Sequence, residues 1–397
     1  MRILLFAGKG GVGKTSIAAS TALLAAERGY KTIVVSLDTA HNLSDVFEVG
    51  ENLFDVKGEP VEVFPNLWIQ EINIQEEIRR HWKEVHGYIT ALFRASGVKE
   101  ILAEELAVLP GMEEVSGLLY LNTYAKRGSF DVVILDCAPT GEAIRFVSLP
   151  TIFEWYMKKF FNLERKIAKF IGPFVEKLYN VPMPEESCFD AVEELFMRLD
   201  GVEKLLSDAR ITSVRLVTNP EKIVVKETQR AFLYFTLYGL CVDGVVVNKV
   251  FPKELEGEFI KGWQLLQDRY LEEIETYFAP LPVFKVPLYE DEVSGIERLK
   301  RLGKDLYGEN DPIQVFRSES PFNFYKEDGL YKLSLKMPFV TRDKIHLSKR
   351  GDELIIEVGV FKRHVILPKT IASLSPRRAR FEGDNLVISF EEGENAI

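Results

Sequence analysis

The segment Gly8–Thr15 constrains the fold of this chain more than any other feature. It reads Gly-Lys-Gly-Gly-Val-Gly-Lys-Thr, follows the apolar run Ile3–Ala7 and leads into the helix-like stretch Thr15–Arg28, which Gly29 closes. Glycines at this spacing let backbone N–H groups converge on a polyphosphate, and the N-terminus of a following helix adds a favourable dipole. The pattern predicts a strand, a phosphate-binding P-loop and a helix; a glycine-rich turn without a ligand is the alternative.

The polar residues of this segment suit a nucleotide bound with a divalent cation. Lys14 brings a positive charge to the β- and γ-phosphates, and the Thr15 hydroxyl is placed to coordinate Mg²⁺. The predicted nucleotide-binding residues of the segment are Gly8, Gly10, Gly11, Val12, Gly13, Lys14, Thr15 and Ser16.

Short apolar runs alternate with longer helical stretches over residues 1–305. Several runs are apolar almost throughout, as expected of parallel strands that are buried on both faces. The alternation predicts an α/β fold with a doubly wound, mostly parallel sheet, whose ligands bind beyond the carboxyl ends of the strands. The runs are Ile3–Ala7, Lys31–Leu37, Val132–Asp136, Ser213–Thr218, Val245–Asn248 and Val283–Val286.

The pattern changes after a cluster of turn-forming residues. We place a linker at about 306–322, where no long periodic segment occurs. Beyond it, apolar residues recur at nearly every second position, which predicts an all-β sandwich over residues 323–397. The alternating segments are Tyr331–Met337, Glu353–Val358 and Asn385–Phe390.

Composition narrows the classes of protein to consider. The net charge is −10, and the 50 Lys and Arg residues are interspersed with the 60 Asp and Glu residues, so there is no basic block to bind nucleic acid. The longest uncharged runs reach about a dozen residues, short of the ~20 that a membrane helix needs. The three cysteines are far apart, which argues against a disulfide framework. We expect a cytoplasmic protein without an integral membrane segment.

Lys9 and several later segments carry a family resemblance. An early second lysine marks the deviant P-loops of dimeric ATPases, and residues 1–305 resemble the arsenite-pump and tail-anchored-protein-targeting ATPases. Ser36–Asp45 is similar to the first switch of that family, and Asp136–Phe146 to the second. The further matching blocks are Pro110–Glu114, Thr218–Glu221, Glu227–Arg230, Val247–Asn248 and Pro287–Gly295.

The resemblance implies a role for each matching residue. ATP and Mg²⁺ are the implied cofactors, and Asp38 would orient the attacking water while Asp136 would bind Mg²⁺ through its water shell. Lys9 would reach the phosphates of a partner subunit, so that Lys9, Lys14 and Asp38 are the expected catalytic residues. Carboxylates that cap turns and a solvated lysine are the alternatives. The implied adenine site consists of Asn248, Pro287 and Leu288.

Some features depart from the family. Thr39 replaces a usual proline, which should soften the first switch, and Glu142 stands where histidine is common. The cysteine pair that holds zinc at some dimer interfaces is missing, and so are the clustered thiols of a metalloid site. Because only one P-loop is present, the two-site arrangement of the family implies a homodimer.

Two regions bear on what the ATPase acts on. In the family the helical subdomain, here about residues 75–125 and 150–212, forms a client groove. An apolar stripe at helical spacing falls in the second part, although packing in the protein's own core explains it equally well. The tail resembles the α-crystallin domain of small heat-shock proteins, and an inert buttress is the alternative there. The stripe residues are Phe153, Tyr156, Phe160, Leu163, Ile167, Phe170, Phe174 and Leu178.

Three hypotheses follow for the function. The first is a Mg²⁺-dependent, nucleotide-gated homodimer that handles hydrophobic protein segments as a chaperone or targeting factor, with a transient membrane receptor left open. The second is the ATPase subunit of an arsenite or anion efflux pump, which arsenite should stimulate. The third is a nucleotide-gated scaffold with negligible turnover, against which intact Lys14, Asp38 and Asp136 argue.

Overall fold

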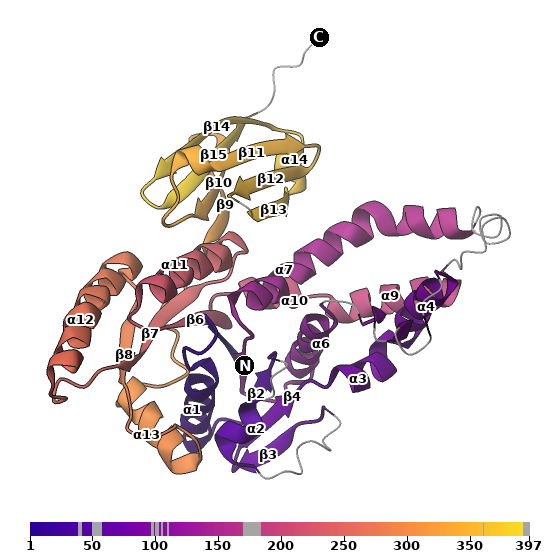
Figure 1. The fold of residues 1–397 in the computed structure, drawn as a ribbon. Helices are drawn as coiled ribbons and strands as arrows, with labels where there is room; N and C mark the ends of the chain where they lie inside the picture. Colours follow the sequence, from indigo (N-terminus) through magenta and orange to yellow (C-terminus); the bar gives the residue numbers. More distant parts are fainter. Residues whose placement is uncertain are drawn as a thin grey trace.

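The computed structural model contains one large sheet, built mainly from parallel strands (Figure 1). It describes residues 1–38, 42–49, 58–96, 99, 103–104, 106–108, 111–169, 184–359 and 361–391. The strand order is β3-β4-β2-β5-β1-β6-β7-β8, and only β3 runs antiparallel to its neighbour. The predicted doubly wound, mostly parallel α/β fold is confirmed. The strands are β1 (Arg2–Ala7), β2 (Thr32–Ser36), β3 (Val61–Phe64), β4 (Leu67–Glu71), β5 (Val132–Asp136), β6 (Thr212–Thr218), β7 (Val242–Val250) and β8 (Val283–Pro287).

Helices cover both faces of the sheet because successive strand residues point in opposite directions. In β1, Leu4 and Phe6 belong to one buried cluster, and Ile3 and Leu5 belong to the other. The helices of the Leu4 side are α1 (Lys14–Glu27), α2 (Asn42–Phe47) and α13 (Ile296–Tyr307). Those of the Ile3 side include α6 (Met112–Arg127), α7 (Thr140–Tyr156), α10 (Val202–Ser207), α11 (Lys222–Leu237) and α12 (Glu258–Phe278).

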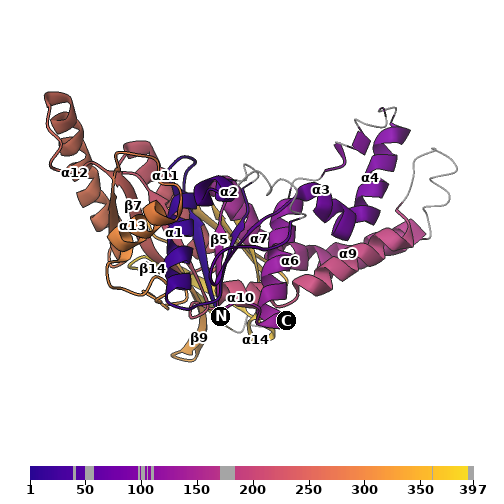
Figure 2. The same cartoon turned by 90° about the horizontal axis from the view of Figure 1, so that it is seen from below.

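Further helices project from one end of the molecule, and α12 lies at the other end (Figure 2). A small satellite cluster of Met157, Phe161 and Phe189 holds part of this projection together. Of the predicted apolar stripe, Phe170, Phe174 and Leu178 lie outside the described residues. The elements of this region are α3 (Ile74–Glu77), α4 (Lys83–Ala95), α9 (Glu186–Leu199) and the π-helical turns η2 (Ile78–Trp82) and η3 (Met157–Phe161).

The C-terminal part is a sandwich of two antiparallel sheets, as predicted. The sheets have the orders β14-β15-β10-β9 and β11-β12-β13, and their inner faces share one apolar core. No helix in the described part of the chain is long and apolar enough to cross a bilayer. The elements are β9 (Phe322–Glu327), β10 (Leu330–Lys336), η4 (Arg342–Lys344), β11 (Ile345–Arg350), β12 (Glu353–Val358), β13 (Phe361–Ile366), α14 (Lys369–Ala372), β14 (Ser375–Glu382) and β15 (Asn385–Glu391).

Residues 308–321 connect α13 to β9, and buried arginines bind this connection to the sheet. Arg215 of β6 is fully buried and donates hydrogen bonds to the carbonyls of Pro312 and, at 3.0 Å, Gln314. Arg2 of β1 donates to the carbonyl of Ile313 at 3.2 Å. The carboxylate of Asp243 pairs with both guanidinium groups, at 3.4 Å with Arg215 and 3.0 Å with Arg2. The connection is therefore an integral part of the ATPase core.

Replacing Arg215 tests how much this anchor contributes to stability. In an Arg215→Met chain, the Pro312 and Gln314 carbonyls lose buried donors and Asp243 loses one of its cations. We expect the free energy of unfolding to fall by about 3 to 5 kcal/mol, measured by urea denaturation. Arg210→Met is the matched control, because Arg210 is 82% exposed and should contribute about 0.5 kcal/mol or less. Equal losses in the two variants would contradict this account.

Candidate functional site

The loop between β1 and α1 has a backbone that only glycine accepts at two positions. A Cβ atom at Gly8 would collide with the carbonyl oxygen of Val217 on the neighbouring strand β6. Gly13 has a φ of 95°, and a Cβ there would collide with the side-chain amide of Asn248. The loop therefore passes close to β6 and β7 before it enters α1, with its N–H groups at the helix N-terminus, where anions bind.

The two predicted lysines of the loop have different surroundings. Lys14, the first residue of α1, is only 7% exposed, and its Nζ donates to the carbonyl of Lys9 at 3.4 Å. The Lys14 side chain therefore folds back over the loop, where a bound phosphate would meet it. Lys9 is half-buried near the tip of the loop.

Asp136 ends β5 and is the buried carboxylate of the site. It is 1% exposed, and its Oδ1 has no hydrogen-bond partner. Burial raises the pKa of Asp136 to about 6; a hydrogen bond with Thr15 and the charge of Lys14 oppose the shift, and Asp38 adds to it. A buried carboxylate with an unpaired oxygen beside a threonine hydroxyl fits a hard divalent cation that prefers oxygen ligands. The residues present therefore fit Mg²⁺.

Asp38 lies at the same sheet edge, two residues beyond β2. It is half-buried, its backbone N–H donates to Ser36 Oγ at 3.2 Å, and its charge acts on Asp136. The neighbouring Leu37 N–H donates to the Asp136 carbonyl at 2.9 Å, which ties the chain directly after β2 to β5. Thr39 lies outside the described residues.

The predicted adenine-site residues line one cavity of about 620 Å³ beside the P-loop. Gly13 and Ser16 line it together with Asn248, Pro287 and Leu288. Asn248 Nδ2 donates to the Val12 carbonyl at 2.9 Å, and Asn248 Oδ1 accepts from the Lys249 N–H at 2.9 Å. The carboxamide therefore braces the loop and keeps one hydrogen and one lone pair for a base.

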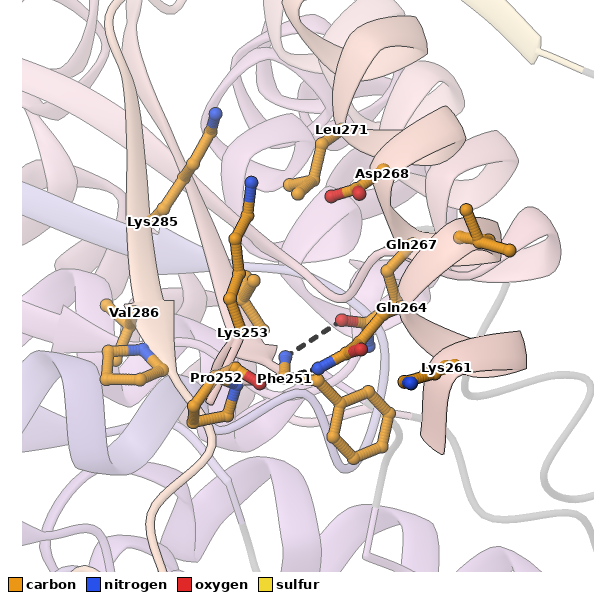
Figure 3. A pocket seen from close by; sticks show the side chains of 13 residues that line it. Phe251, Pro252, Lys253, Lys261, Gln264, Gln267, Asp268, Leu271, Lys285 and Val286 are labelled. Carbon is orange, nitrogen blue, oxygen red and sulfur yellow. Dashed lines mark hydrogen bonds between the residues drawn. The ribbon is translucent and has the colours of Figure 1, made fainter. Parts of the chain in front are cut away.

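Sequence reasoning missed two side chains that hold the end of β7. Lys249 has a φ of 61°, and its Nζ donates to the Gly11 carbonyl at 2.9 Å. Gln267 of α12 accepts from the Phe251 N–H at 2.9 Å (Figure 3). It also donates to the Lys249 carbonyl at 3.3 Å. These residues line or adjoin a second cavity of about 640 Å³, which shares Pro287 with the first. The one available signal was a lysine directly after Asn248; nothing in the sequence of α12 singles out Gln267.

Glu227 was also missed as an individual residue of the site. It lies on α11, and its carboxylate accepts a hydrogen bond at 3.0 Å from the hydroxyl of Thr140, the first residue of α7. Glu142 stands in the first turn of α7. Burial raises the pKa of Glu113, and Glu114, Glu142 and Asp38 add to the shift. The start of α7 is therefore connected to α11 and lies in an acidic environment.

The loop, the buried carboxylate and the doubly wound sheet define a P-loop nucleoside triphosphatase. Comparison with known protein families assigns the chain to a narrower class. Residues 1–308 match the family described as anion-transporting ATPase, and residues 328–390 match an HSP20-like domain found in ArsA. The chain belongs to the anion-transporting ATPase family and is an ATP hydrolase with an HSP20-like C-terminal domain.

Several relatives are similar over nearly the whole chain. “Putative arsenical pump-driving ATPase 1” of Aquifex aeolicus is 51% identical, with 98% of this chain and 99% of the relative covered. A Chlorobaculum tepidum protein of similar name is 37% identical, with 98% of this chain and 96% of the relative covered. “ATPase get3” of Pyrenophora tritici-repentis is 29% identical, with 77% of this chain and 91% of the relative covered.

The raised pKa of Asp136 predicts a pH dependence of binding. Below about pH 6 the carboxyl group of the nucleotide-free protein is protonated, so a cation must displace a proton to bind there. We expect the affinity for Mg²⁺–ATP to rise about fivefold between pH 5 and pH 6 and to level off above pH 7. Titration with a fluorescent ATP analogue measures this affinity at each pH.

Asp136→Asn is the control for that titration, because its side chain does not ionise and the titration of ATP itself remains. The pH dependence of the variant should be flatter by the contribution of Asp136. The same slope in both proteins would contradict the role of Asp136 as the titrating group.

Proposed function

We propose that this ATPase hydrolyses Mg²⁺–ATP between two copies of the chain and uses the cycle to bind and release hydrophobic protein segments. The observation that carries the proposal is the convergence of the glycine loop, Lys14, Asp136 and Asp38 at one sheet edge. Phosphoryl transfer depends mainly on such positioning and on charge. We place the protein in the cytoplasm.

In this proposal the metal and the nucleotide have separate sets of ligands. Thr15 would coordinate Mg²⁺ directly, and Asp136 would bind the water shell of the cation. The cation would neutralise charge on the phosphates. Lys14 and the N–H groups of the loop would bind the β- and γ-phosphates. The base would enter the cavity beside Asn248, where Pro287 and Leu288 offer apolar surface.

Asp38 is proposed to orient the attacking water. Asp38 lies near Asp136 and is only half-buried. Its carboxylate would therefore be able to reach a water molecule beside the γ-phosphate. A carboxylate can align that water and accept its proton, whereas the amide of asparagine is a far weaker base.

An Asp38→Asn chain should therefore bind ATP with nearly unchanged affinity and hydrolyse it about 10²- to 10⁴-fold more slowly. Steady-state phosphate release measures the rate, and titration with a fluorescent nucleotide measures the affinity. Asp328→Asn is the matched control, because Asp328 is exposed in the turn between β9 and β10 and the variant should hydrolyse ATP at the wild-type rate. Turnover at the wild-type rate in Asp38→Asn would exclude the proposed role.

The homodimer is proposed from the single P-loop and from Lys9. Lys9 lies near the tip of the loop, so it can face a second copy, and a cation brought to the phosphates in trans would stabilise transition-state charge. The 29% identical relatives named get3 or GET3 support this family assignment.

Mixing two inactive chains tests the exchange of Lys9 between subunits. Lys9→Ala should fold normally and lose about 10²-fold or more in turnover. In a mixture of Lys9→Ala with Asp38→Asn, some dimers pair an intact Asp38 with an intact Lys9 from the partner, so activity should reappear. A mixture that stays as inactive as its components, with heterodimers present by native mass spectrometry, would reject the contact in trans.

The client-binding part of the proposal is based on an exposed apolar surface at the end of α7 that is remote from Thr140. Ile152 of α7 and Phe160, Leu163 and Ile167 of the helical segment that continues it are between 40% and 55% exposed. Apolar side chains at this spacing form a face that a hydrophobic helix can cover. Partners isolated with the hydrolysis-deficient Asp38→Asn chain would identify the client.

A pump subunit is the second candidate, because the 51% and 37% identical relatives carry arsenical-pump names. Arsenite binding needs clustered thiolates, whereas Cys137, Cys188 and Cys241 are each buried, and burial raises the pKa of each thiol. Stimulation of turnover by arsenite or antimonite would favour the pump; unchanged turnover would favour the protein client. A scaffold without turnover is not compatible with the family's ATPase activity.

A further inference from the structure

Two helices run from the second switch to the sandwich. α7 begins at Thr140, directly after the loop that follows Asp136, and α11 lies beside it. Near the switch the helices are joined by the hydrogen bond from Thr140 to Glu227. Their other ends reach the sandwich, which lies above both in Figure 1. A displacement of α7 relative to α11 at the switch would therefore change the surface on which the sandwich sits.

The contact with α11 is largely apolar. Leu237 belongs to the buried core of the sandwich, and Leu233 packs against that core. Phe339 of the sandwich has its ring centre 6.0 Å from that of Phe232. Arg363 of β13 donates to the Leu237 carbonyl at the end of α11. This side of the contact resembles a domain core and fixes the sandwich on α11.

The contact with the α7 side is different, because it is polar and incompletely filled. Lys159 of η3 pairs with Asp352 at 3.0 Å, and both side chains are between 42% and 49% exposed. The rings of Trp155 and His364 are 5.5 Å apart. Beside these pairs lies a cavity of about 530 Å³, with Glu154 and Lys158 on the α7 side and Arg363 on the sandwich side.

The polar groups in this cavity are imperfectly paired. Arg363 is buried, its Nε has no hydrogen-bond partner, and burial lowers its pKa to about 10. The pKa of Glu203 on α10 is raised by partial desolvation and by a hydrogen bond with Glu154. A surface that holds an exposed ion pair, a cavity and a partly satisfied arginine is less costly to separate than a packed core.

We propose that the sandwich is a brake on the ATPase: fixed to α11 and resting on α7, it holds the two helices in one relative position and slows the nucleotide cycle. The buried hydrogen bonds of Arg2 and Arg215 to residues 312–314 limit how far the sandwich can follow α7. Movement of α7 then requires the polar contact to open or slide. Any change that docking makes in the affinity for nucleotide is matched by an equal effect of nucleotide on docking, because coupling between binding free energies is reciprocal.

This inference rests on the proposed function, together with the expectation from the sequence that Asp136–Phe146, after β5, is the second switch of the ATPase. The two can fail separately. If Asp38→Asn loses hydrolysis, the proposed function is supported. If release of the sandwich from α7 then leaves turnover unchanged, the brake is overturned while the proposed function stands.

A reversible cross-link between the two domains tests the brake in the full chain. In a Lys159→Cys/Asp352→Cys chain, a short bis-methanethiosulfonate reagent should join the exposed thiols and leave the three natural cysteines untouched, because these are buried. We expect turnover to fall at least fivefold after cross-linking and to recover when a reductant cleaves the link. Turnover that is unchanged or raised by the cross-link would overturn the proposal.

The matched control places the same link inside the sandwich. Arg377 and Glu391 pair at 2.9 Å on neighbouring strands β14 and β15, and they are 57% and 40% exposed. Cross-linked Arg377→Cys/Glu391→Cys should hydrolyse ATP at the rate of the unlinked chain. An equal fall in this control would also overturn the proposal, since the loss would then not depend on the contact with α7.

Charge reversal tests the same contact without a cross-link. Lys159→Glu places two carboxylates together and should raise turnover about 1.5- to 5-fold, the range that an exposed ion pair can supply. Lys159→Glu/Asp352→Lys restores the pair and should return the rate to that of the wild type. Equal rates in all three chains, or a lower rate in Lys159→Glu, would contradict the brake.

Discussion

The parallel register of β1, β2 and β5 is the constraint on which the site depends. Phe6 and Ser36 both pair with Asp136, so the residues that follow the three strands emerge side by side. The chain after Phe6 becomes the glycine loop, and the chain after Ser36 leads to Asp38. Because all these residues leave the sheet at one edge, charges from three distant parts of the sequence gather around one phosphate-sized space. The helix dipole of α1 adds to the same field.

Much of this arrangement could be predicted, because buried parallel strands have a strong sequence pattern. β1, β2, β5 and β6 are buried along their whole length and stand out as apolar runs. The strands β3 and β4 were missed: Val61–Phe64 has four residues and none is fully buried, so the antiparallel edge carries little signal. The site residues that directly follow a strand could be predicted from the order of strands along the sequence. Lys249, Gln267 and Glu227 could not, since their contacts depend on how α11, α12 and β7 approach the loop.

The site retains polar groups that are not fully paired. Asp136 keeps an unpaired oxygen and a raised pKa, and Glu113 shares the acidic surroundings of Asp38. Buried carboxylates of this kind destabilise the nucleotide-free state, and a cation with its triphosphate would relieve that cost. In that case the free energy of ligand binding includes the relief of repulsion among the protein's own groups. Binding of that ligand would therefore favour the conformation in which these carboxylates lie close together.

The two domains are joined by two kinds of contact that differ in how costly they are to break. The connection over residues 308–321 is held by arginines whose hydrogen-bond partners are buried carbonyls and Asp243, so movement there would expose unpaired charge. The contact with α7 relies on exposed charges around a cavity, where water can replace each lost partner. A domain attached firmly on one side and weakly on the other can pivot at low energetic cost. The weak side rests on the helix that begins at the second switch, which is where nucleotide-dependent forces would enter the sandwich.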